Sequence, residues 1–301
     1  MLKKALPFLI ILLLVIPVGL FFYFFKDKTI PDNRIDAIEA VPVDAILMLE
    51  SRAIPNLLQL FNSKKQIVED LNYLDGFRPM LAGLKNLDSL LVRDKELAAK
   101  LNLVPGILSV HQTGDQQFQS LLILQANGRI GHKDFMNLGL QLTGEKGIHT
   151  EKSYSRNKIH ELNFKEGSIF PKLYVSTVKK YLVISTSDLL VEEVMRNVKT
   201  GVSLNQLEDF KLAASVAGQN ADANVYLNMK RFSNMASFMM NPAIASFMTE
   251  FNRYGAWLEL DLTLREDMIL ASGFGIPGDT LAWLDLFNNQ SPQKNKLDEV
   301  L

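Results

Sequence analysis

The sequence predicts an α+β protein, with a single N-terminal transmembrane helix followed by a mostly antiparallel sheet that has helices packed on one face. Three observations predict this class. An uncharged apolar run begins the chain, short segments of alternating hydrophobicity recur after it, and apolar residues at helical spacing separate several of those segments. Neighbouring strands joined by short turns pair antiparallel, so the sheet is expected to be mostly of that kind.

The first element is a membrane anchor over residues 1–28. From Ala5 to Phe25 there is no charged residue, and a helix of that length spans roughly 30 Å, the thickness of the bilayer's hydrocarbon. A cleaved signal peptide and a buried core helix are the alternatives. A signal peptide ends at small residues, whereas this run ends in the bulky Phe21–Phe25, and a core helix would not need to be apolar on every face. The expected anchor residues are Leu6, Phe8, Leu9, Ile10, Leu13, Val15, Pro17, Leu20, Phe21, Tyr23 and Phe25.

The charges that flank the apolar run predict the orientation. Lys3, Lys4 and the terminal amine slightly outweigh Lys26-Asp27-Lys28, which favours an N-terminus inside and the bulk of the chain outside. We therefore expect a single-pass protein of the inner (cytoplasmic) membrane, with most of the chain in the periplasm. Its expected partners are the lipid bilayer, through the N-terminal helix, and other envelope proteins.

Composition bounds the rest of the chain. A net charge of −1 with 22% charged residues gives no mark of a nucleic-acid binder, so no nucleic-acid partner is expected. The absence of cysteine excludes disulfides, thiolate metal sites and cysteine nucleophiles. Residues 26–42 are polar with two prolines, so residues 29–41 are expected to be a linker, followed by an extracytoplasmic domain over 42–290. Residues 291–301 are expected to be a polar tail or a linker to a further segment.

Periodicity predicts the elements of the domain in order. Helix 185–201 is expected to begin at Ser187, whose side chain can cap it, and to end at Gly201. The region 231–252 is expected to be helical with a break near Asn241-Pro242, and residues 256–276 are expected to form a hairpin. The other expected strands are 43–51, two strands within 106–127 around a turn at 113–115, 147–154, 157–164, 169–177, 180–186 and 223–229. The other expected helices are 54–71, 77–102, 132–144, 204–217 and 279–289.

Two stretches of the chain resemble each other. "DAILMLESRAIPNLLQLF" and "DANVYLNMKRFSNMASFMM" both run from Asp-Ala through a strand and a basic residue into an apolar helix. Coincidence and an internal repeat are both open. If the repeat is real, the domain consists of two similar strand–helix halves that share one sheet.

The glycine-rich stretch "GFGIPG" (273–278) matches the glycine spacing of a dinucleotide-binding fingerprint. That fingerprint needs a second strand with an acidic residue about 20 residues further on. Only 23 residues follow Gly278, and they contain no second predicted strand. Pro277 also lacks a backbone donor, and Asp279 is better placed as a helix cap. No cofactor is therefore expected.

The search for catalytic residues ends without a constellation. Of the four histidines, none forms a zinc-peptidase motif, and only His149 and His160, on neighbouring predicted strands, could face each other. No nucleophile elbow and no phosphate-binding loop is present. We expect no catalytic residue, no metal site and no enzymatic activity.

The stretch 228–251 is rich in methionine and phenylalanine. Methionine is common on surfaces that accept varied apolar partners, so a groove for a lipid, a peptide or a partner helix is one interpretation. A helix pair that covers the sheet is the other, because apolar periodicity more often marks a core. The residues of the expected apolar surface are Phe232, Met235, Phe238, Met239, Met240, Phe247, Met248 and Phe251.

Several phrases resemble one bacterial family. "VPVDAILMLE", "ILSVHQTG", "FQSLLIL", "YLVISTSDLLVEEVM", "GVSLNQLEDF" and "ANVYLNM" occur in an order that resembles the membrane-anchored envelope proteins of the domain of unknown function 3352 family. The resemblance covers most of residues 41–301. It implies a periplasm-facing α+β domain with no established activity and no functional residue to carry over.

These observations lead to two expected functions. The favoured one is a membrane-anchored, periplasm-facing interaction or scaffold domain without enzymatic activity. The alternative is a binder or carrier of an apolar ligand, such as a lipid or a peptide, through residues 228–251.

Overall fold

The computed structural model describes residues 36–52, 94–101, 104–115, 117–126, 148–163, 172–239, 253–265 and 268–278, together with a few single positions between them. The chain divides into two compact units, residues 1–34 and 35–301, and every described residue belongs to the second. Within those described residues, no helix has the length and apolar composition needed to cross a membrane. The predicted anchor itself lies outside the described residues.

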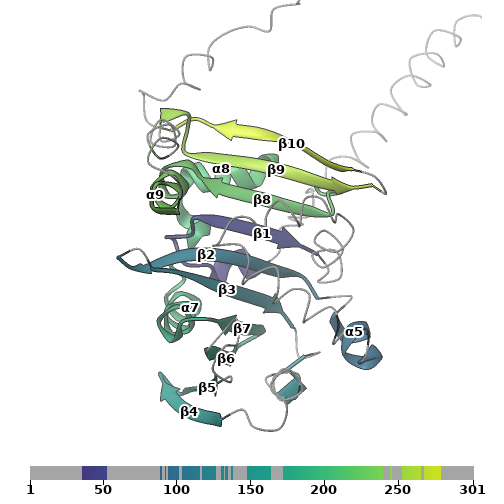
Figure 1. Cartoon of the computed structure of the whole chain (residues 1–301), viewed down its shortest axis with the longest axis vertical. Coiled ribbons are helices and arrows are strands. Elements are labelled where there is room, and N and C mark those ends of the chain that lie inside the picture. Colours follow the sequence, from purple (N-terminus) through teal and green to yellow (C-terminus); the bar gives the residue numbers. More distant parts are fainter. Residues whose placement is uncertain are drawn as a thin grey trace, which may run out of the picture. The chain divides into compact units, whose positions relative to one another are not determined.

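The core of the second unit is one ten-stranded sheet in the order β10-β9-β8-β1-β2-β3-β7-β6-β5-β4 (Figure 1). All nine pairings between neighbours are antiparallel. The predicted α+β class with a mostly antiparallel sheet is therefore confirmed. The strands are β1 (Leu47–Ser51), β2 (Gly106–Gly114), β3 (Gln117–Gln125), β4 (Ile148–Tyr154), β5 (Asn157–Asn163), β6 (Lys172–Val178), β7 (Tyr181–Ser185), β8 (Ala223–Asn228), β9 (Trp257–Leu264) and β10 (Ile269–Ile276).

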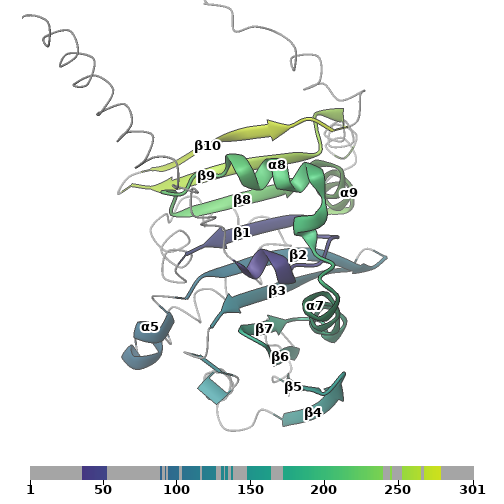
Figure 2. The ribbon, with the colours of Figure 1, turned by 180° about the vertical axis from the view of Figure 1, so that it is seen from behind.

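Helices lie on both faces of this sheet. One face, which we call the α8 face, packs against η1 (Asp36–Ala40), α7 (Asp188–Thr200), η2 (Leu204–Gln206) and α8 (Glu208–Val216) (Figure 2). The other face, which we call the α5 face, packs against α5 (Lys95–Leu101). The prediction of helices on one face only is therefore wrong. Its physical reason is visible in β7, which is buried at all five positions and so needs cover on both sides.

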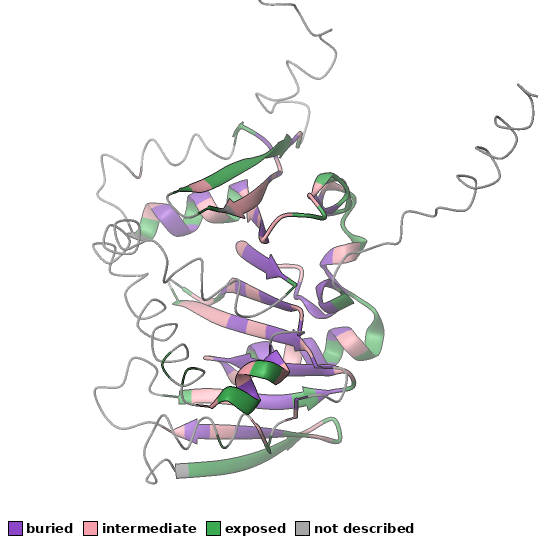
Figure 3. Cartoon of the chain, turned by 90° about the vertical axis from the view of Figure 1, so that its right-hand side faces the viewer, coloured by how far each residue is buried: buried purple, intermediate pink, exposed green. Residues whose placement is uncertain are grey.

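Each face has its own hydrophobic core. Side chains at alternate positions of a strand point to opposite faces, so consecutive residues Met48 and Leu49 of β1 belong to different cores. Fully buried residues of the α8 face include Tyr226, Phe210 and Trp257, and the ring of Phe210 contacts the other two rings. The central strands are buried, and the outer strands β4 and β10 are exposed over most of their length (Figure 3).

The alternating segments predicted the strands well, and the differences lie at the borders. Residues 36–41, which we placed in the linker, belong to the domain, since Ala37, Ile38, Ala40 and Val41 are buried in the α8-face core. Their apolar side chains alternate with polar ones at short spacing, which hid this 3₁₀ turn in a polar, proline-flanked segment. The predicted strand 43–51 is shorter, because β1 begins at Leu47.

Helix α7 confirms one predicted end and corrects the other. Gly201 ends the helix in the left-handed conformation, with φ 77°, as predicted. Ser187 stands at the N-cap position, but its side chain makes no capping hydrogen bond. Its backbone N–H instead donates to the Ser185 hydroxyl at 3.0 Å. The predicted helices 54–71, 279–289 and most of 77–102 and 132–144 lie outside the described residues.

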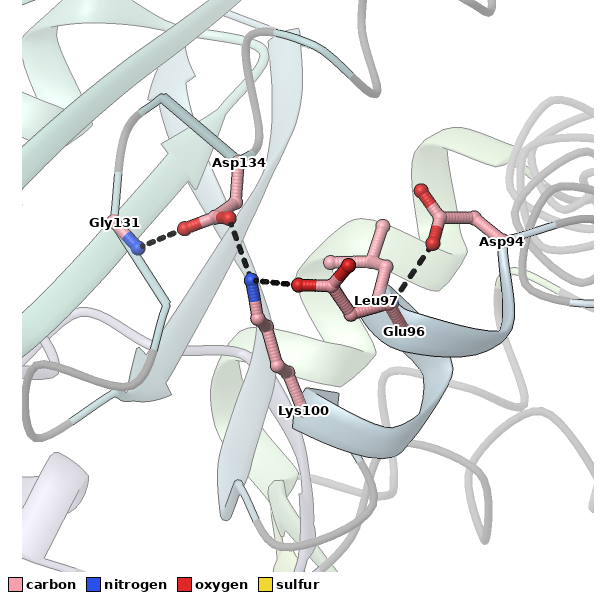
Figure 4. A network of polar contacts seen from close by, with 6 residues as sticks. All are labelled: Asp94, Glu96, Leu97, Lys100, Gly131 and Asp134. Carbon is pink, nitrogen blue, oxygen red and sulfur yellow. Dashed lines mark hydrogen bonds and ion pairs between the residues drawn. The ribbon is translucent and has the colours of Figure 1, made fainter.

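Helix α5 is fixed by carboxylates at its start and on its side (Figure 4). Asp94 caps the helix, since its Oδ1 accepts from the backbone N–H of Leu97 at 2.9 Å. Lys100 lies 3.1 Å from Glu96 in the same helix and 3.1 Å from Asp134. The other oxygen of Asp134 accepts from the backbone N–H of Gly131. This network ties α5 to residues that follow the β2–β3 hairpin in the chain.

The six strands at one end of the sheet pair symmetrically about β1 and β8. The shift that aligns Asp44-Ala45 with Asp222-Ala223 also aligns Met48 with Tyr226, and these two residues are paired with each other. Met48 is followed across the sheet by Ser109 on β2 and Leu121 on β3. Tyr226 is followed in the opposite direction by Glu259 on β9 and Phe274 on β10. β3 therefore occupies the same place in one half that β10 occupies in the other.

Candidate functional site

A hydrogen-bonded chain of three polar side chains lies in the α8-face core. His111 Nδ1 is 2.7 Å from Asp44 Oδ1, and His111 Nε2 is 2.8 Å from Ser109 Oγ. Ser109 and His111 are two residues apart on β2, so both point to the same face. The exposed fraction of each is 0%. This order of carboxylate, imidazole and hydroxyl is the one that activates serine in hydrolases.

Burial decides the role of this chain. Ser109 Oγ lies 2.8 Å from His111 Nε2 and 3.3 Å from the carbonyl oxygen of Leu121, and its one hydrogen can serve only one of these acceptors. A serine that is completely buried offers no room for a substrate. We conclude that the three groups satisfy one another and hold β2 in register with β3 and the turn before β1.

The charges around Asp44 fit this structural role. Burial alone raises the pKa of Asp44, but the hydrogen bond and the charge of His111 outweigh it and hold the pKa below its ordinary value. Glu193 on α7 lies near both groups, and its half-buried position raises its pKa. Sequence reasoning missed this chain. Ser109 and His111 share a face by alternation, but the contact with Asp44 depends on a strand pairing that one sequence does not reveal.

A second set of polar groups, which we call the buried acid cluster, lies beneath α8. It consists of Glu50 on β1, Asn224 and Tyr226 on β8, and Glu259 and Asp261 on β9. The Tyr226 hydroxyl donates to Glu50 Oε2 at 3.0 Å, and the Asn224 amide donates to Asp261 Oδ1 at 2.6 Å. Among the residues with described positions, no group of three or more histidines and acids is arranged around one metal ion.

Glu259 is the exceptional member of the cluster. Its exposed fraction is 0%, and neither carboxyl oxygen has a hydrogen-bond partner in bonding geometry. The indole N–H of Trp257, two residues away on the same face, is also buried without a partner. Burial is the main cause that raises the pKa of Glu259 to about 8, and the neighbouring acids Asp261 and Glu50 raise it further. The carboxyl group is therefore mostly protonated at neutral pH.

The structure confirms that His149 and His160 face each other. Their rings stack with centroids 5.2 Å apart, and His149 Nε2 lies 3.0 Å from His160 Nδ1. Glu151 Oε2 lies 3.6 Å from the same nitrogen of His160. The pair lies on β4 and β5, at the edge of the sheet opposite β10. This is the one histidine pairing that the sequence predicted.

A cavity of about 600 Å³ lies beside the C-terminal end of α7, η2 and the turn between β6 and β7. Two amide atoms in its lining are buried without a partner, Asn197 Nδ2 and Asn205 Oδ1. Its lysines are already engaged, since Lys179 donates to the Val198 carbonyl and Lys180 pairs with Asp36. The cavity therefore offers these two neutral amide groups, and its lining also includes the carboxylate of Glu39 and the hydroxyl of Ser203.

Part of the expected apolar surface can be located. Helix α9 (Met229–Met239) covers its first part, where Met235 is buried, Phe232 is half-buried and Phe238 is exposed. Phe238 lies 6.5 Å from the ring of Phe118 on β3. The buried Met235 fits a helix packed on other parts of the chain better than an open groove. Met240, Phe247, Met248 and Phe251 lie outside the described residues, as does the side chain of Met239.

The glycines of "GFGIPG" have a structural reason. Gly273 and Gly275 lie within β10, whereas the glycines of a dinucleotide fingerprint lie in the turn after a strand. A Cβ at Gly273 would lie 1.8 Å from the backbone oxygen of Glu259. Glycine is therefore needed for the close approach of β10 to β9.

No protein-family model, curated protein or solved structure matches this chain. The resemblance to the domain of unknown function 3352 family therefore stays a prediction.

Proposed function

We propose that the chain is a membrane-anchored interaction domain of the bacterial envelope, which binds an extended segment of a partner envelope protein along the open edge of β10. In this proposal, residues 1–28 anchor the protein in the inner membrane and the ten-stranded sheet faces the periplasm. The domain performs no chemistry of its own, which is consistent with a Ser–His–Asp chain that is fully used inside the core. The observation that carries the proposal is the state of β10.

Among the residues that the structure describes, β10 is an edge strand without the usual protection. Six of its eight residues are exposed, including Leu270 and Phe274 with exposed fractions of 40% and 57%. Its sequence, ILASGFGI, has no charge and no proline. Natural proteins usually protect such edges with charges, prolines or bulges. The opposite edge strand β4 has this protection, since it carries Glu151 and Lys152.

The symmetric pairing indicates what belongs beside β10. β3, which occupies the equivalent place in the other half, pairs on its outer side with the antiparallel strand β7, beginning at Leu121 opposite Ser185. β10 is the last strand of the described sheet on its side. An antiparallel strand from a partner would complete the second half as β7 completes the first. Such strand addition is a recurring way for proteins to bind extended peptides.

The backbone of β10 presents the groups that this binding needs. Arg265 N donates to Met268 O at the turn end of the β9–β10 hairpin, and hydrogen-bonded pairs alternate from there along an antiparallel ladder. Leu270, Ser272 and Phe274 therefore direct their N–H groups to β9. Ile269, Ala271, Gly273 and Gly275 direct theirs away from it. These outward groups are the expected sites of hydrogen bonding to the partner.

The proposal can be tested by photo-crosslinking in the membrane. A crosslinking amino acid at Phe274 should capture a partner, whereas the same amino acid at Leu189 on α7, which is also 57% exposed, should not. The substitution Ala271→Pro removes one outward N–H and leaves the β9 pairing intact, so it should abolish the crosslink from Phe274. Ala271→Ser keeps the N–H and should preserve it.

Three outcomes would contradict the proposal. They are an equal set of products from both crosslinking positions, a crosslink from Phe274 that survives Ala271→Pro, and a crosslink to a second copy of this chain. Thermal melting of each variant in detergent separates loss of binding from loss of folding.

A further inference from the structure

The histidine pair at the β4–β5 edge has the arrangement of two metal ligands. The register places His149 opposite Leu162 and Glu151 opposite His160, so all four side chains point to the α5 face. Leu162 is buried, and His160 has an exposed fraction of only 7%. His149 and Glu151 are exposed. The imidazole of His160 is therefore held rigidly, and an ion can reach it from the solvent side.

The separation of the two nitrogens suits one ion between them. His149 Nε2 and His160 Nδ1 are 3.0 Å apart. Two imidazoles bound tetrahedrally to one ion at 2.0–2.1 Å have nitrogens about 3.3 Å apart. The two nitrogens would therefore have to separate by only a few tenths of an ångström, and both rings would have to turn so that their lone pairs point at the ion. In its absence the two nitrogens share a single proton, and the ion would replace that proton.

Glu151 is the nearest further ligand. Its Oε2 lies 3.6 Å from His160 Nδ1, and its Oε1 pairs with Lys158 at 2.7 Å. The hydrogen bond with Lys158 is the main cause that holds the pKa of Glu151 below its ordinary value, so the carboxylate is charged at neutral pH. Within the described part of the chain, three ligands are not yet in place around one point. Glu151 would have to rotate away from Lys158, and water would fill the remaining positions.

We propose that His149 and His160 form a binding site for one divalent transition-metal ion, Zn²⁺, Ni²⁺ or Cu²⁺, with Glu151 as a third ligand. Imidazole and carboxylate ligands suit these ions, whereas Mg²⁺ and Ca²⁺ prefer sites made only of oxygen. The bound ion would link the exposed edge strand β4 to β5. This site is independent of the proposed strand addition, because it lies at the opposite edge of the sheet.

Titration of the full-length chain with metal, in detergent and without a histidine tag, tests the site. We expect one Zn²⁺ per chain by isothermal calorimetry after removal of metal with a chelator. We also expect Mg²⁺ not to bind. His149→Gln changes an exposed ligand and should weaken Zn²⁺ binding at least tenfold. Glu151→Gln should weaken it less than His149→Gln does.

Two controls come from the same chain. Lys158→Gln frees Glu151 and should leave the affinity unchanged or increase it. His132→Gln removes a histidine outside the hairpin and should have no effect. With Cu²⁺, the electron paramagnetic resonance spectrum should show coupling to two imidazole nitrogens in the wild type and to one in His149→Gln. Absence of Zn²⁺ binding, equal binding by His149→Gln, or an effect of His132→Gln as large as that of His149→Gln would overturn the proposal.

Discussion

The substitution Glu259→Gln should stabilise the domain, and by an amount that grows with pH. Glu259 is buried completely, and both of its carboxyl oxygens lack a hydrogen-bond partner. Its pKa in the folded chain is about 8, compared with an ordinary value of 4.5. Glutamine has nearly the same shape as the protonated acid and is neutral at every pH, so the variant removes the ionisation and keeps the packing.

The sign and size of the effect follow from the two protonation equilibria. Between the two pKa values, the folded state keeps its proton and the unfolded state loses it, so ionisation favours unfolding as the pH rises. Below the unfolded pKa both states are protonated and the effect vanishes. Each unit of pKa difference corresponds to about 1.4 kcal/mol. From pH 5 to pH 8 the wild type should therefore lose about 3–4 kcal/mol of unfolding free energy through this one group.

Urea unfolding of the full-length chain in detergent, at four pH values from about 5 to 8, measures this difference. The gap in unfolding free energy between Glu259→Gln and the wild type should be small at the lowest pH and widen toward the highest. Glu208→Gln changes an acid of α8 whose side chain is 84% exposed, and its gap should stay nearly constant. A constant gap for Glu259→Gln would show that the buried carboxyl is not protonated in the folded state, and would refute the reasoning.

Two further substitutions test other close contacts. Gly273→Ala places a Cβ 1.8 Å from the backbone oxygen of Glu259, so it should lower the unfolding free energy by about 3 kcal/mol or more in the same urea assay. Gly131→Ala is its control and should have little effect, because nothing lies within 4 Å of the added atom. Ser109→Ala leaves Nε2 of the buried His111 imidazole without its hydroxyl partner and should cost about 1–3 kcal/mol by thermal melting. Equal stability of Gly273→Ala and Gly131→Ala, or of Ser109→Ala and the wild type, would contradict these readings.

The strands could be predicted because each is bounded by turn residues and alternates along its length. The hairpin of β2 and β3 is the clearest case, although β2 runs to Gly114 and β3 begins at Gln117, so the turn comes slightly later than the predicted 113–115. The sequence did not predict that helices cover both faces of the sheet. Alternation along a strand separates the side chains of its two faces, but it does not show whether the more polar face is exposed to solvent or covered by a helix. In β9, the alternating leucines and acids would normally be assigned inward and outward, yet Glu259 is fully buried and Leu258 is only half-buried.

In the candidate sites too, contacts between residues close in the sequence could be predicted and contacts between distant residues could not. The facing histidines could be predicted because β4 and β5 are consecutive strands joined by a tight turn, so their register follows from the chain. The chain from Asp44 to Ser109 could not, since it crosses 67 residues between Asp44 and His111. The buried acid cluster spans even more of the sequence, from Glu50 to Tyr226, across 176 residues. Local patterns give no information on contacts at such separations.

The symmetric pairing links the sequence echo to the open edge. Two similar strand–helix halves that arose by repetition would each have needed a strand outside their third strand, or protection of its edge. In the half that contains β3, the strands β4 to β7 follow in the chain, and the last of them, β7, pairs with the outer side of β3. In the half that contains β10, the described sheet ends there. Ser109 and Glu259 occupy equivalent places but have diverged into a fully bonded hydroxyl and an unpartnered carboxyl. Since β7 supplies the outer pairing of β3, an antiparallel strand added at β10 should supply the equivalent pairing to the other half.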